Sequence, residues 1–65
     1  MRIKVNGRDY ELPDDGDIHA LLTAHKLVPD QVAVELNRRI VRAAKYDTKL
    51  KTGDEVEIVT FVGGG

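Results

Sequence analysis

One short segment of this 65-residue sequence has a helical hydrophobic period, and it limits what the rest of the chain can form. Apolar positions recur there at the spacing of an amphipathic helix, which we expect over residues 18–27. The stripe consists of Ile18, Leu21, Leu22 and His25. Asp17 precedes it as a predicted N-cap, and Pro29 lies beyond its end. A helix with a single apolar stripe needs another element to cover, so the remaining residues should supply a sheet face.

Alternating apolar and polar residues predict strands on both sides of this helix. The segment MRIKVNGRDYEL predicts a β-hairpin, because Asn6-Gly7 is a preferred two-residue turn and both residue types tolerate positive φ. This register places Tyr10 opposite Ile3. QVAVELN predicts a further strand, and NRRIV a second tight turn that returns Val41 to the core face.

The C-terminal third contains one ambiguous segment and one clear strand. AAKYDTKL is either an irregular connection or a single helical turn, anchored by Tyr46 and Leu50. KTGDEVEIV predicts a turn followed by the last strand. Two hairpins flanking one helix give an α+β fold of the β-grasp (ubiquitin-like) class, with a mixed sheet packed on the helix. We expect one domain over residues 1–65 with a flexible tail over 60–65, and a core that contains Ile3, Val5, Leu21, Leu22, Val34, Leu36, Val56 and Ile58.

The composition excludes several kinds of chemistry. The chain has no cysteine and no serine, so it offers no thiol or serine nucleophile and no thiolate metal site. His19 and His25 point to different helix faces, and we expect no metal site. A net charge of −1 gives no reason to expect nucleic acid or an anionic membrane as a partner. There is no apolar run that could span a bilayer and no signal-peptide pattern, so we expect a cytoplasmic protein.

The basic residues after the second turn allow two interpretations. Arg38, Arg39, Arg42 and Lys45 lack interleaved aromatic residues, which argues against nucleic-acid binding. They form either a solvated edge or a patch that steers an acidic partner.

The last strand changes character before it ends. Glu55 and Glu57 mark its solvent face, and the same alternation places Val59 and Phe61 on that face. Ile40 falls on the same face of the neighbouring hairpin if Val41 points inward. With Val62, these residues predict a partner-binding surface, because clustered exposed apolar side chains indicate docking. The alternative is that the strand twists or bulges, so that Phe61 packs at the rim of the core.

Three consecutive glycines follow this strand. Gly63, Gly64 and Gly65 are either a frayed terminus or a reactive tail. Glycines cost much entropy to order and add no packing, so such a segment is useful where backbone must enter a narrow space. A terminal carboxylate on glycine is also the least hindered acyl carbon that a protein can present.

The chain resembles the ThiS family, the sulfur carriers of thiamine biosynthesis. The resemblance covers the whole chain and rests on VNGRDYEL, on VAVELN followed by IV, and above all on the ending GDEVEIVTFVGGG. The family often has glycine and proline where this chain has Arg38 and Arg42, which affects turn geometry and surface charge but not the tail.

The resemblance implies a carrier rather than an enzyme. A ThiF-like adenylyltransferase would use ATP to adenylate the Gly65 carboxylate, and the chain itself would bind no cofactor. Sulfur from a cysteine desulfurase would then give a thiocarboxylate, which a ThiG-like thiazole synthase would use. Three alternatives stay open: a molybdopterin-synthase small-subunit type of carrier, a ubiquitin-like modifier of lysines, and a structural TGS-type domain.

Overall fold

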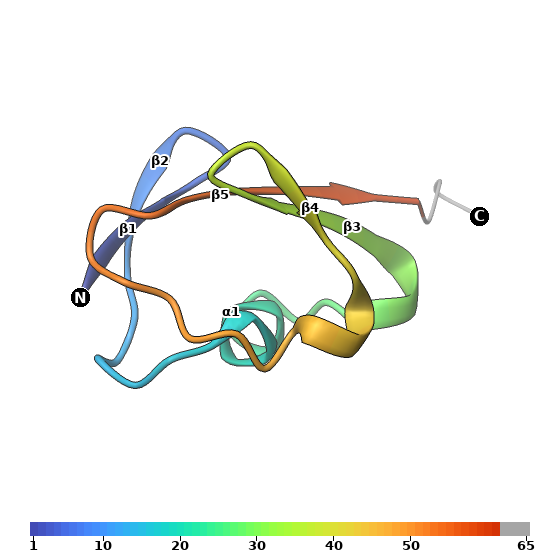
Figure 1. The fold of residues 1–65 in the computed structure, drawn as a ribbon, viewed down its shortest axis with the longest axis horizontal. Helices are drawn as coiled ribbons and strands as arrows, with labels where there is room; N and C mark the ends of the chain where they lie inside the picture. The colour runs from blue at the N-terminus through green and yellow to red at the C-terminus, as the bar shows by residue number, and fades with distance from the viewer. Residues whose placement is uncertain (62–65) are drawn as a thin grey trace.

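The computed structural model describes residues 1–61, which form one mixed sheet with a short helix on one face (Figure 1). The helix α1 spans Ile18–Ala24, and two 3-10 turns, η1 and η2, span Pro29–Gln31 and Ala43–Lys45. The strands are β1 (Arg2–Val5), β2 (Arg8–Glu11), β3 (Val32–Leu36), β4 (Arg39–Val41) and β5 (Glu55–Thr60). Their order in the sheet is β2-β1-β5-β3-β4, with β1 and β5 parallel and the other neighbours antiparallel. The predicted element order and mixed sheet are confirmed.

Both hairpins turn on two residues with positive φ. Asn6 and Gly7 have φ of 51° and 82°, and Ile3 pairs with Tyr10, as predicted. The second turn has Asn37 at 50° and Arg38 at 71°. Arginine in this left-handed region costs on the order of 1 kcal/mol relative to glycine, so this turn is formed against the preference of one of its residues.

The side chains of the two turn asparagines tie both hairpins to β5. Asn6 Oδ1 accepts the Ile58 N–H at 2.8 Å, and Asn6 Nδ2 donates to the Ile58 carbonyl at 3.3 Å. Asn37 Oδ1 accepts the Glu55 N–H at 2.9 Å. The parallel ladder of β1 and β5 ends at Val5 and Val56, so the Asn6 amide continues it by replacing a backbone partner.

The helix begins as predicted and ends early. Asp17 caps it by accepting the Ala20 N–H at 2.8 Å. The helix stops at Ala24 rather than at residue 27, because Lys26 adopts a φ of 59°. Its N–H bonds the Thr23 carbonyl at 3.0 Å and the Leu27 N–H bonds the Leu22 carbonyl at 2.9 Å. This pair of bonds is a Schellman motif, formed here without the usual glycine.

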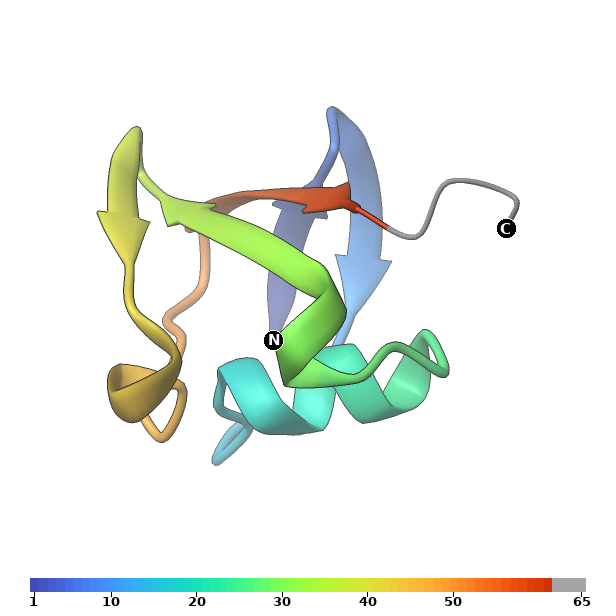
Figure 2. The same ribbon diagram turned by 90° about the vertical axis from the view of Figure 1, so that its right-hand side faces the viewer.

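Helix α1 lies against one face of the sheet (Figures 1 and 2), and buried side chains of both contribute to the core. Seven of the eight predicted core residues are buried, and Leu36 is half-buried. Tyr46 and Leu50 are also buried, after the single turn of η2, which confirms them as anchors of that segment. The buried hydrophobic residues outside the predicted core set are Leu12, Ile18, Val32, Tyr46 and Leu50.

Candidate functional site

The outer face of the sheet, which is turned away from α1, contains an apolar patch near the end of β5. Val56 and Ile58 point into the core, whereas Val59 is 58% exposed and Phe61 is 65% exposed. Ile40 on β4 is 79% exposed. We call Ile40, Val59 and Phe61 the outer patch. The alternative that Phe61 packs at the rim of the core is therefore wrong.

The strand register explains why these residues share one surface. Val59 pairs with Ala33 on β3, and Ile40 pairs with Glu35, two residues further along the same strand. Phe61 follows β5 directly, and its N–H donates to the Gln31 carbonyl at 2.8 Å. The backbone is therefore fixed up to Phe61, and the outer patch rests on three hydrogen-bonded strands. Its role in partner binding stays a prediction, and Val62, Gly63, Gly64 and Gly65 lie outside the described residues.

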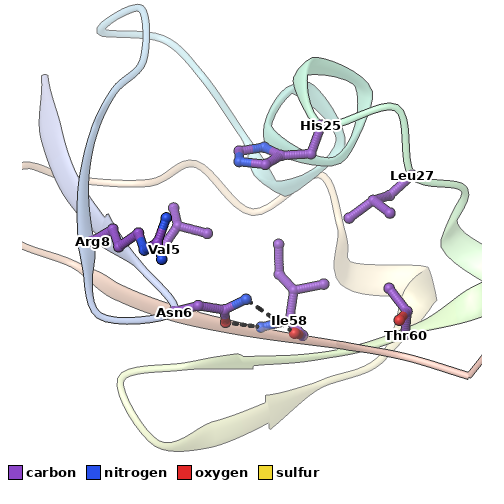
Figure 3. A pocket seen from close by; sticks show the side chains of 7 residues that line it. All are labelled: Val5, Asn6, Arg8, His25, Leu27, Ile58 and Thr60. Atoms are coloured by element: carbon purple, nitrogen blue, oxygen red, sulfur yellow. Dashed lines mark hydrogen bonds between the residues drawn. The ribbon is translucent and has the colours of Figure 1, made fainter.

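A hollow of about 450 Å³ lies on the opposite, helix-side face of β5 (Figure 3). Its lining comes from the first hairpin, the end of the helix and β5: Val5, Asn6, Arg8, His25, Leu27, Ile58 and Thr60. The fold already uses two of its polar groups. Asn6 bonds Ile58, and His25 Nδ1 lies 3.0 Å from the Leu21 carbonyl, with its ring centroid 4.8 Å from that of Tyr10. This hollow could not be predicted from the sequence, because three separate segments form it.

The other singled-out side chains are not brought together. His19 packs edge-on against Tyr46, with their ring centroids 5.9 Å apart, whereas His25 lies beside Tyr10. The two histidines are therefore not in contact. Within residues 1–61, no group of three or more histidine or acidic side chains could hold a metal ion. In that range no helix is long and apolar enough to cross a membrane.

The four basic residues lie along the β4 edge and the segment after it. All four are exposed, and over the described range none of them forms an ion pair within 4 Å. The two interpretations of Arg38, Arg39, Arg42 and Lys45 therefore stay open.

Comparison with known proteins gives one consistent result. The model of the ThiS family matches residues 3–65. The sulfur carrier protein ThiS of Bacillus subtilis is 38% identical over 65 residues, which is 97% of this chain and 98% of that protein. A thiazole synthase of Magnetococcus marinus is 33% identical over 66 residues, and this chain spans only 20% of its length. The crystal structure of the thiamine biosynthesis protein ThiS from Geobacter metallireducens superposes with a TM-score of 0.80 at 33% identity, covering 100% of both chains. This match confirms the β-grasp fold.

Proposed function

The chain belongs to the ThiS family, and from this premise we propose that it is a sulfur carrier protein of thiamine biosynthesis. In this role it is a co-substrate of other enzymes and not itself a catalyst. The observation that supports the proposal most directly is the near full-length similarity to a sulfur carrier of the same size, together with the glycine ending.

The sulfur is proposed to be carried on the carboxyl group of Gly65. A carboxylate oxygen is a poor leaving group, so a ThiF-like adenylyltransferase must first activate it. The carboxylate attacks the α-phosphorus of ATP, pyrophosphate leaves, and an acyl adenylate forms. The terminal sulfur of a persulfide, supplied by a cysteine desulfurase, attacks the acyl carbon and releases AMP. A thiol then cleaves the acyl disulfide, which leaves a thiocarboxylate and a new disulfide. This chain has no cysteine, so it cannot hold a persulfide of its own.

The position of the outer patch supports delivery of this group to a partner. The last described backbone hydrogen bond holds Phe61 to Gln31. Four further residues reach Gly65, and four residues of any conformation span at most about 14 Å. A partner that binds the outer patch would therefore have the acyl carbon within about 14 Å of Phe61. Because glycines carry no side chain, they would pass through a narrow channel into an active site.

A thiazole synthase is the proposed acceptor of the sulfur. Two proteins described as thiazole synthases, from Magnetococcus marinus and Paramagnetospirillum magneticum, each contain a segment that is similar to this whole chain. A carrier-like segment within such a synthase supports close association between the two components.

Intact-mass measurement tests the proposal. The chain is incubated with a ThiF-like enzyme, ATP, a cysteine desulfurase and cysteine, and the same mixture without ATP is the control. We expect the mass change of one oxygen-to-sulfur exchange in the complete mixture only. A covalent adduct with another protein would instead support a ubiquitin-like modifier, and an unchanged mass would contradict a sulfur carrier.

Two tail variants locate the reaction. Removal of Gly64 and Gly65 should abolish adenylation while leaving thermal stability nearly unchanged, because glycines add no packing. Gly64→Val should also abolish adenylation with little change in thermal stability. A β-branched side chain restricts the backbone and makes the tail too wide for a narrow channel. If the shortened chain were still adenylated, Gly65 would not be the site of activation.

A further inference from the structure

The outer face of the sheet has two halves with different charge patterns. On the half formed by β1 and β2, opposite charges face each other across the strands. Arg2 Nε lies 3.1 Å from Glu11 Oε1, and Lys4 Nζ lies 3.3 Å from Asp9 Oδ1. Both pairs are direct cross-strand partners, so this half neutralises its own charges.

The half formed by β3 and β5 does the opposite. Glu35 and Glu57 are direct cross-strand partners, and both are exposed on the outer face. Like charges directly opposite each other destabilise a sheet. Among residues 1–61 no cation lies within 4 Å of either carboxylate. Arg42 falls on the same face if the alternation of β4 continues, but it forms no such ion pair.

The like-charged pair lies beside the outer patch. Ile40 is the cross-strand partner of Glu35, and Val59 follows Glu57 by two residues on the same face of β5. The repulsion does not help the free chain to fold. A cation placed between the two carboxylates would be attracted to both and would offset their repulsion. A partner surface that covers Ile40 and Val59 would also exclude water and strengthen this attraction.

We propose that Glu35 and Glu57 together receive one arginine side chain of a partner protein whose contact surface is otherwise apolar. The inference rests on the proposed function, and it assigns this arginine to the thiazole synthase. Directly paired residues have Cβ atoms about 5 Å apart, so two carboxylates can approach one guanidinium, which presents five donors in a planar fork. A metal ion is a poorer occupant, because two exposed carboxylates are fewer ligands than Mg²⁺ or Ca²⁺ requires.

The test compares binding with folding in one pair of variants. Glu35→Gln and Glu57→Gln are combined, which removes both charges and keeps the side-chain size. Asp9→Asn is the matched control, because it removes one exposed carboxylate from the other half of the same face. Affinity for the purified thiazole synthase is measured by calorimetry at low and at physiological salt, and stability is measured by urea unfolding.

We expect the double variant to bind the synthase about tenfold more weakly or worse, with a smaller dependence on salt. Its free energy of unfolding should be equal to or higher than that of the wild type, since a repulsion has been removed. Asp9→Asn should bind as the wild type does. A loss of affinity without a loss of stability is the result that supports the inference.

Three outcomes would overturn the inference. In the first, the double variant binds the synthase as tightly as the wild type does. In the second, the double variant and Asp9→Asn lose the same amount of affinity for the synthase. In the third, the double variant loses affinity for the ThiF-like enzyme or for a second copy of the chain, but not for the synthase. The intact-mass experiment separates this failure from that of the proposed function. If the wild type acquires sulfur and the double variant binds normally, only the arginine contact is wrong. If the wild type neither acquires sulfur nor binds the synthase, both proposals are wrong.

Discussion

Replacing Phe61 with aspartate should separate partner binding from folding. Phe61 is 65% exposed, and its backbone N–H donates to the Gln31 carbonyl in a bond that does not involve the side chain. The fold therefore covers only about a third of the surface of Phe61. The rest is available to a partner, and it lies where the described backbone ends.

The exposed fraction divides the expected free energies. A fully buried aromatic side chain covers about 200 Å². The fold covers about 70 Å² of the Phe61 ring, so at about 25 cal/mol per Å² the substitution should lower the free energy of unfolding by at most about 2 kcal/mol. If a partner covers the remaining area of about 130 Å², the substitution should weaken the binding free energy by about 3 kcal/mol. This loss corresponds to an increase in Kd of about a hundredfold. The aspartate carboxylate adds a desolvation cost in the complex and none in the free protein.

The assay measures both quantities on the same preparation. Affinity for the ThiF-like enzyme and for the thiazole synthase is measured by calorimetry, and stability by urea unfolding. Val28→Asp is the matched control, because Val28 is also a partly exposed apolar residue, at 47%, but lies outside the outer patch. It should leave both affinities unchanged. Normal affinity of Phe61→Asp combined with a loss of stability above about 2 kcal/mol would refute the assignment of Phe61 to a docking surface.

Three further predictions concern the fold. Leu22→Ala should cost about 2–5 kcal/mol, because Leu22 is fully buried; a urea-unfolding loss within experimental error would contradict this. Asn6→Asp should cost about 1–3 kcal/mol at neutral pH, since a carboxylate oxygen replaces the amide donor to the Ile58 carbonyl. The cost should shrink below about pH 4, where the protonated acid can donate, and an unchanged cost there would refute the reasoning. Burial raises the pKa of Tyr46, so the wild type should lose stability as the pH rises above 10.0, because the unfolded chain ionises first. Tyr46→Phe should lack this loss, and parallel stability curves would contradict it.

Local patterns in the sequence were sufficient to predict the strands and their faces. The pairing of Ile3 with Tyr10 follows from a two-residue turn at Asn6-Gly7, and that turn requires only local information. The outward position of Val59 follows from the alternation that begins at Glu55. These predictions succeeded because a strand has a fixed period of two, so one known residue fixes the rest.

Features that depend on distant contacts or unusual backbone could not be predicted. The helix ends early because Lys26 has a positive φ. Glycine or asparagine usually occupies such a position, and neither is present there to predict the helix end. The bond between Asn6 and Ile58 joins residues 52 positions apart. The Phe61 N–H bonds the Gln31 carbonyl, whereas the sequence alone left a twist or bulge of the strand open at that position.

The opposition of Glu35 and Glu57 is of the same kind. From the sequence, each glutamate is predicted only to be a solvent-facing residue of its strand. Only the antiparallel register of β3 and β5, in which Val34 pairs with Ile58, brings the two carboxylates together. A repulsive pair is therefore a property of the sheet and not of either segment.

Strand β5 alternates buried core side chains with exposed side chains, and we predict that the exposed ones near its end bind a partner. Ile58 is 8% exposed and contributes to the core, whereas its neighbour Val59 is 58% exposed and contributes little to it. A domain of this size has a small core, so it has little stability to lose at a binding surface. Because the predicted recognition residues Val59 and Phe61 lie on the outer face, we expect their replacement to have little effect on folding. Because Asn6 and Asn37 bond β5 from the two hairpins, the strand itself stays fixed when those outer residues are replaced. Backbone and asparagine contacts therefore hold β5 up to Phe61, and we predict that the outer side chains set the strength of docking.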